Sequence, residues 1–109
     1  MADTYKSLGQ SKPSAATLTT LYTVPSSTSA IVSTIKVCNL SAAATTFRLA
    51  HRVGGAAIED KFYFYYDEII PGNSTFTITS GITLATTDII SVYATLATVT
   101  FNMWGVEKT

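Results

Sequence analysis

The chain alternates apolar and polar residues over short runs, and residues that favour turns separate these runs. Alternation with a period of two is typical of strands that have one buried and one exposed face. Pro25, the Gly54-Gly55 pair and the Pro71-Gly72 pair break the chain between runs, as turn residues do. The pattern predicts seven strands, at residues 17–24, 30–39, 45–52, 61–67, 74–79, 89–95 and 99–107.

Seven short strands can bury their apolar sides against a second sheet, so the predicted fold is all-β. We expect a single-domain antiparallel β-sandwich over residues 17–109. The spacing does not distinguish a jelly-roll from an immunoglobulin-like topology, so both stay open. The turn after Pro25 predicts that runs 17–24 and 30–39 form a hairpin. Apolar residues never recur at helical spacing between caps, so almost no helix is expected.

The first sixteen residues differ from the rest, because they are small and polar, contain Gly9 and Pro13, and show no apolar periodicity. They carry too little apolar surface to offset the backbone entropy lost on ordering, about 1–2 kcal/mol per residue. We therefore interpret residues 1–16 as an N-terminal arm outside the core, which becomes ordered only against a partner or a neighbouring subunit.

The same alternation predicts which side chains fill the core, because every second residue of a strand faces inward. The residues expected there are Leu21, Ile31, Ile35, Val37, Phe47, Leu49, Phe76, Ile78, Ile90, Val92, Phe101 and Trp104.

Five aromatic residues follow one another within the fourth predicted strand. A regular strand would place Phe62, Phe64 and Tyr66 on one face and Tyr63 and Tyr65 on the other. A sandwich strand has one dry and one wet face, so this run requires burial on both sides or an exposed aromatic patch. Tyrosine suits interfaces because it joins apolar area to a hydroxyl that tolerates water. The run is our candidate protein interface, with core filling and glycan binding as the alternatives.

Composition and charge exclude several classes of partner. The 7 basic and 7 acidic residues give a net charge of zero, so no basic face for a nucleic-acid backbone is expected. The 19 threonines and 11 serines interrupt every apolar stretch, which argues against a membrane-spanning helix and a membrane partner. The N-terminus lacks the basic start and apolar core of a signal peptide, so we expect synthesis in the cytoplasm. The lone Cys38 is interpreted as a small buried hydrophobe.

Few residues carry the chemistry of a catalytic or metal site. His51, the single histidine, has no nearby cysteine and no carboxylate two residues away, so a structural or interface role is expected. Asp88 is interpreted as an Asx turn at a strand entrance rather than a calcium ligand. No Gly-x-Ser-x-Gly elbow is present, so we expect no enzyme activity, no metal and no cofactor.

Four carboxylates bracket the aromatic run: Glu59, Asp60, Asp67 and Glu68. Paired carboxylates carry out glycoside hydrolysis. Charges at strand ends are more simply solvated loop residues, and a chain of this length rarely builds a large cleft. We therefore do not interpret these carboxylates as a catalytic pair.

Several short strings resemble small virion structural proteins of tailed bacteriophages, including those of cyanophages. They are LYTVP at 21–25, VCN at 37–39, FRLA at 47–50, YYD at 65–67, GITL at 81–84, DIISVY at 88–93, TFN at 100–102 and WGVE at 104–107. The resemblance spans most of residues 17–107. It implies a particle component, such as a head decoration (cement) protein or a neck, tail or baseplate protein, and it brings no catalytic residues with it.

Two classes of function follow from these observations. The first is a non-enzymatic virion subunit, capsid decoration in the leading version, that forms homo-oligomers and binds other virion proteins. The second is a module that recognises a host glycan or receptor. Exposed aromatics in a concave groove with polar side chains would favour the second class, and aromatics buried against a neighbouring copy would favour the first.

Overall fold

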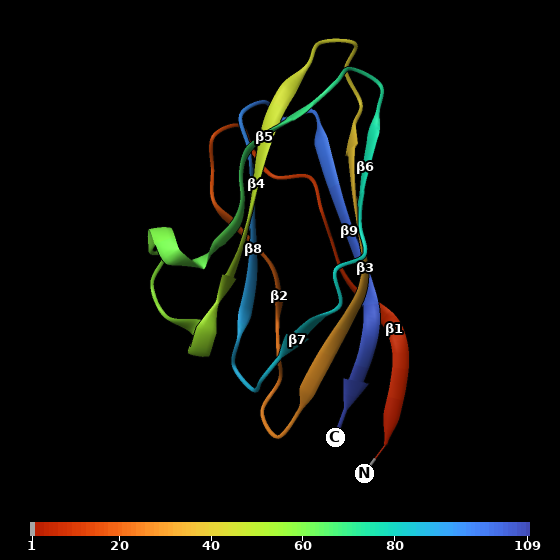
Figure 1. Cartoon of the computed structure of the whole chain (residues 1–109), viewed down its shortest axis with the longest axis vertical. Helices are drawn as coiled ribbons and strands as arrows, with labels where there is room; N and C mark the ends of the chain where they lie inside the picture. Colours follow the sequence, from red (N-terminus) through yellow and green to blue (C-terminus); the bar gives the residue numbers. More distant parts are fainter. Residues whose placement is uncertain (1) are drawn as a thin grey trace.

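The computed structural model describes residues 2–109, whose strands form two sheets that face each other (Figure 1). The strands are β1 (Asp3–Ser11), β2 (Thr19–Thr23), β3 (Ser29–Asn39), β4 (Thr45–Arg52), β5 (Tyr63–Ile70), β6 (Thr75–Ile78), β7 (Ile82–Leu84), β8 (Ile89–Ala94) and β9 (Val99–Lys108). Within this part of the chain, helical geometry is limited to two 3-10 turns, η1 (Val53–Gly55) and η2 (Asp60–Phe62). No helix among the described residues is long and apolar enough to cross a bilayer.

The order of the strands decides the topology that the sequence left open. One sheet has the order β1-β9-β3-β6, with β7 also paired to β3, and the other has the order β2-β8-β4-β5. All pairs are antiparallel, and they nest: β1 with β9, β2 with β8, β3 with β6 and β4 with β5. This nesting is the jelly-roll order of double-sheet sandwiches. The predicted all-β antiparallel sandwich is confirmed, with jelly-roll rather than immunoglobulin-like topology.

The N-terminal segment is part of this sandwich, so its interpretation as an arm outside the core is wrong for β1. The strand pairs with β9 from Asp3↔Lys108 to Ser11↔Phe101, and its Leu8 is buried in the core. This stretch has few apolar residues, and its backbone hydrogen bonds to β9 offset the backbone entropy that is lost when it becomes ordered. Met1 lies outside the described residues, so the interpretation is not addressed there.

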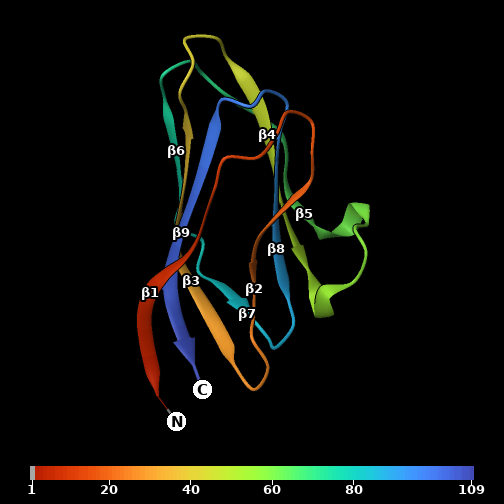
Figure 2. The same ribbon diagram turned by 180° about the vertical axis from the view of Figure 1, so that it is seen from behind.

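The predicted hairpin between runs 17–24 and 30–39 is also wrong. β2 pairs with β8, and β3 pairs with β9 in the other sheet, so residues 25–28 cross between the sheets (Figure 2). The end of β2 stays bound to the start of β8, because the Val24 N–H donates to the Asp88 carbonyl at 2.9 Å. Alternation shows which face of a strand is buried and not which strand lies beside it.

The core between the sheets contains most of the predicted side chains, with Phe76 partly buried against it. Ile31 and Trp104 are the exceptions, since they are 42% and 39% exposed on the outer face of their sheet. Their neighbours Val32 and Met103 take the inward positions instead. In β3 a register shift after Val32 changes the phase of the alternation and places Ile31 outside. In β9 the alternation continues unbroken, and Trp104 lies opposite in phase to Met103.

Candidate interaction edge

The aromatic run lies at the edge of a sheet, because β5 is the last strand in the order β2-β8-β4-β5. We call residues 62–66 the aromatic edge. Phe62 belongs to the turn η2, and the strand begins at Tyr63. Two register shifts interrupt the pairing of β5 with β4, and Asp67 has a φ of 51°. Such bulges leave extra residues unpaired and re-aim the side chains beside them.

The predicted division of the five aromatics between two faces is therefore wrong. Phe62 is not in the strand, and the Tyr66 ring packs edge-on against Tyr63, with their centroids 5.0 Å apart. Phe64 instead packs edge-on against Tyr65, at 5.6 Å. A strand without bulges would have placed Tyr66 and Phe64 together. The sequence contains no signal that locates these bulges.

Tyr65 is partly buried and packs against the core. Its ring lies 6.0 Å from the ring of Phe47 and 5.5 Å from that of Phe76, centroid to centroid. Phe76 lies on β6 in the opposite sheet, so Tyr65 joins the two sheets near the open side of the sandwich. Core filling, one of the alternatives for the run, thus holds for this one residue.

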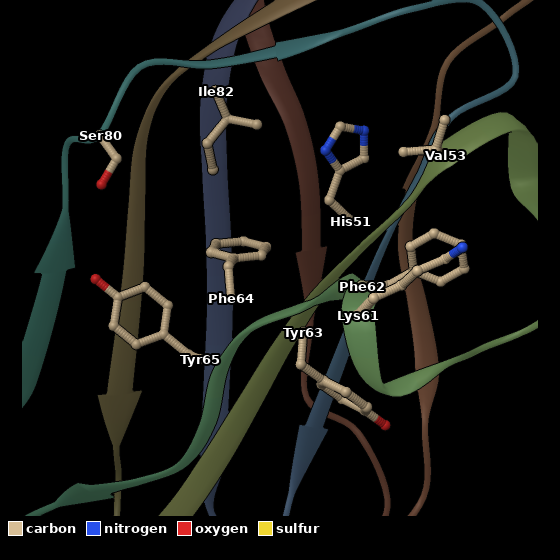
Figure 3. A pocket seen from close by; sticks show the side chains of 9 residues that line it. All are labelled: His51, Val53, Lys61, Phe62, Tyr63, Phe64, Tyr65, Ser80 and Ile82. Carbon is tan, nitrogen blue, oxygen red and sulfur yellow. The ribbon is translucent and has the colours of Figure 1, made fainter.

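A pocket of about 480 Å³ opens between the aromatic edge and the segment around β7. Figure 3 shows Phe64 beneath Ile82, with Tyr65 and Ser80 on one side of it and His51 on the other. The remaining lining comes from Val53 and residues 61–63. The pocket therefore combines aromatic rings with a hydroxyl, an imidazole and an ammonium group. Aromatic rings in a concave site with polar side chains are the arrangement expected of a module that recognises a host glycan or receptor.

The outer side of the aromatic edge is organised by an arginine. The Arg48 guanidinium on β4 lies 4.1 Å from the centroid of the Tyr66 ring and 4.2 Å from that of Tyr93. It also donates to both carboxylate oxygens of Asp67, at 2.7 and 3.3 Å. This hydrogen-bonded carboxylate raises the pKa of Arg48, which stays charged. The stacked cation holds the Tyr66 ring at the surface.

His51 lies beside the pocket and is tied to a buried carboxylate. Its Nε2 lies 2.8 Å from Asp88 Oδ2, and the backbone N–H groups of Gly54 and Ala85 donate to the Asp88 carboxylate at 2.7 and 3.0 Å. Burial raises the pKa of Asp88, but these hydrogen bonds outweigh it, so the net shift is downward. Asp88 thus joins the η1 turn to the start of β8. It accepts from residues that precede it, which an Asx turn does not.

The remaining residues singled out by the sequence form no further cluster. Glu59 precedes η2 and Asp60 begins it, and both are exposed, as expected for solvated residues, whereas Glu68 is half-buried and Asp67 is paired with Arg48. Cys38 is half-buried rather than buried, because Val37 and Asn39 take the inward positions beside it. Over residues 2–109, no three metal-ligating side chains come together. The absence of catalysis, metal and cofactor stays a prediction.

A second exposed apolar area escaped the sequence analysis. Tyr5, Val106 and Ile31 lie in one row across β1, β9 and β3, and Trp104 lies in the next row. We call these four residues the outer stripe. Tyr5 is 82% exposed, and the stripe covers the outer face of the β1-β9-β3-β6 sheet near the chain ends. The sequence does contain one signal of the outer stripe: alternation in the last strand puts Trp104 on the face opposite to Met103.

Comparison of the chain with protein-family models, with curated proteins and with solved structures finds no match. The class of protein that the fold and the site define is a jelly-roll sandwich with an exposed aromatic edge.

Proposed function

We propose that this chain is a non-enzymatic bacteriophage virion protein, a capsid decoration (cement) or other accessory subunit. In this role it is made in the host cytoplasm and stabilises the particle through contacts with other virion proteins and with copies of itself. A place in the tail, neck or baseplate is the alternative within the same class. The support from the sequence is the resemblance of residues 17–107 to small phage virion proteins.

One structural observation carries the proposal: exposed apolar side chains continue along β5 beyond the pocket. Tyr66 is 58% exposed and Ile69 is 65% exposed, and Phe64 is exposed as well. Exposed apolar side chains spread along one edge strand are suited to another protein surface, because interface cores are enriched in aromatic side chains. Jelly rolls occur in viral capsid and lectin domains, so the fold agrees with the proposal without selecting it.

Replacing Phe64 and Tyr66 together by serine should leave the fold intact and weaken incorporation into particles by at least about tenfold, because each residue is exposed and aromatic. Tyr65→Ser is unsuitable for this test, since that ring packs in the core. Circular dichroism checks the fold, and reconstitution with labelled protein measures incorporation.

The matched control replaces Leu40 and Leu96 by serine, because both are exposed apolar residues outside the aromatic edge. This control should be incorporated like the wild type. Normal incorporation of the Phe64→Ser, Tyr66→Ser variant would contradict the proposed role of the edge.

A host glycan-recognition module is the second candidate, and the pocket is the observation that favours it. Phe64 and Tyr65 line it together with Ser80, His51 and Lys61. An aromatic face can pack on the apolar face of a sugar ring while polar groups bind its hydroxyls. The same Phe64→Ser, Tyr66→Ser variant separates the candidates. Incorporation at the wild-type level with loss of binding to host surface polysaccharide would favour recognition.

A further inference from the structure

The first half of β1 presents backbone groups that nothing in the described chain binds. Ala2 and Thr109 exchange both backbone hydrogen bonds, at 3.0 and 3.3 Å, so they form a hydrogen-bonded pair. Because such pairs alternate along an antiparallel ladder, Thr4 and Lys6 also bind β9. The N–H and C=O groups of Asp3, Tyr5 and Ser7 therefore point away from the sheet. We call residues 3–7 the free β1 edge.

Over residues 3–7 the free β1 edge pairs with β9 in unbroken register, and the register shift of β1 comes after it, between Ser7 and Gly9. β5 is bulged twice, β2 contains a register shift, and β6 and β7 span four and three residues. Short or bulged edges are the usual protection against pairing with another chain. Beyond the register shift β1 approaches β2 of the other sheet, since a Cβ on Gly9 would lie 2.4 Å from the Leu21 carbonyl oxygen. Figures 1 and 2 both show β1 at the lateral border of the molecule.

The residues of this edge are complementary to themselves. An antiparallel pairing with a two-fold axis at Tyr5 sets Tyr5 opposite Tyr5, Asp3 opposite Ser7 and Lys6 opposite Thr4 of the other copy. All three outward-facing residues then exchange hydrogen bonds, and no like charges face each other. Lys6 is already neutralised by Glu107 of its own chain at 3.2 Å.

The side chains on the outer face strengthen the same pairing. Glu107 accepts from Tyr22 of the opposite sheet and from Lys6, so Lys6 lies on the inner face. Asp3, Tyr5 and Ser7 therefore point to the outer face. Pairing at Tyr5 would bring the two outer stripes together, with the two Tyr5 rings as a cross-strand pair between the Val106 side chains. Such aromatic pairs stabilise sheets. An exposed tyrosine and an unprotected strand edge thus share one explanation.

We propose that a second copy of this chain pairs with the free β1 edge, so that two β1-β9-β3-β6 sheets become one continuous sheet. A two-fold contact of this kind is closed and isologous, as in most homodimers. It assigns self-association to β1 and leaves the aromatic edge free for a different partner. The pairing stands whether that partner is a virion protein or a glycan.

The test measures the mass of the full chain by light scattering over a series of concentrations, together with amide hydrogen exchange. Because the paired segment is short, the mass should rise with concentration from that of one chain, 11.6 kDa, to twice that value. Tyr5→Pro removes an outward N–H that β9 does not use, so this variant should fold and keep the mass of one chain. Tyr5→Val keeps that N–H and is the matched control, which should still dimerise.

Hydrogen exchange tests the pairing without any substitution. The amides of Tyr5 and Ser7 should exchange more slowly as concentration rises, while those of Thr4 and Lys6 should be protected throughout. Fast exchange of Tyr5 and Ser7 at every concentration, or a Tyr5→Pro variant that dimerises like the wild type, would overturn the proposal. Dissociation by Phe64→Ser with Tyr66→Ser, but not by Tyr5→Pro, would assign self-association to the aromatic edge instead. Particle incorporation is measured in a separate experiment. A chain that dimerises through β1 but is not incorporated into particles would contradict the virion role and leave the pairing intact.

Discussion

Replacing Phe47 by alanine should lower the free energy of unfolding by about 3–5 kcal/mol, so that the variant scarcely folds. Phe47 is fully buried on β4, and its ring lies 5.5 Å from Phe76 and 6.1 Å from Phe101, centroid to centroid. Both partners belong to the opposite sheet. Truncation would therefore remove the contact that joins the sheets and leave a cavity that the surrounding strands fill only in part.

Denaturant unfolding followed by circular dichroism measures this effect. The matched control is Phe64→Ala, the same truncation at a partly exposed ring, which should cost about 1 kcal/mol or less. A Phe47→Ala variant that unfolds at the wild-type denaturant concentration would show that this ring does not join the sheets.

Replacing Asp88 by alanine should lower the free energy of unfolding by about 1–3 kcal/mol, because Asp88 is buried and the N–H groups of Gly54 and Ala85 would lose the acceptor of two partly buried hydrogen bonds. His51 would lose its partner as well. Asp67→Ala removes a carboxylate that is largely exposed and should cost about 1 kcal/mol or less, which makes it the control. Equal losses in the two variants would contradict the structural role of Asp88.

The pH dependence of stability tests the same carboxylate in a second way. Hydrogen bonds lower the pKa of Asp88 in the folded chain, and the hydrogen bond from Tyr22 lowers that of Glu107. A lowered folded-state pKa contributes stability above the unfolded-state values, about 3.9 for Asp and 4.3 for Glu, and this stability is lost as pH falls through the folded pKa. The denaturant concentration at the unfolding midpoint should therefore decrease when the pH is lowered below about 4. The Asp88→Asn variant should lose less stability than the wild type over this pH range. An equal loss in the two proteins would contradict the role of Asp88 in the pH dependence.

The sequence by itself determined the fold class, because alternation reports the one property that every strand of a sandwich shares, a buried face. It also determined most of the core, including Phe47, Leu49 and Phe101. At Ile31 the alternation shifts within β3, and at Trp104 the size of the side chain was given more weight than the alternation, so two exposed residues were assigned to the core. It identified the aromatic run as unusual, because five aromatics in succession cannot all face one core.

Only the tertiary structure decided which strands are neighbours. The partner of β1 is β9, at the other end of the chain, and no local pattern in a polar segment reports a ladder formed so far away in sequence. The bulges in β5 decided which rings meet: Tyr65 turned into the core and Tyr66 stacked beside Arg48. Backbone pairing and bulges depend on contacts between distant segments, so the free β1 edge and the shape of the aromatic edge could be recognised only once the sheets were assembled.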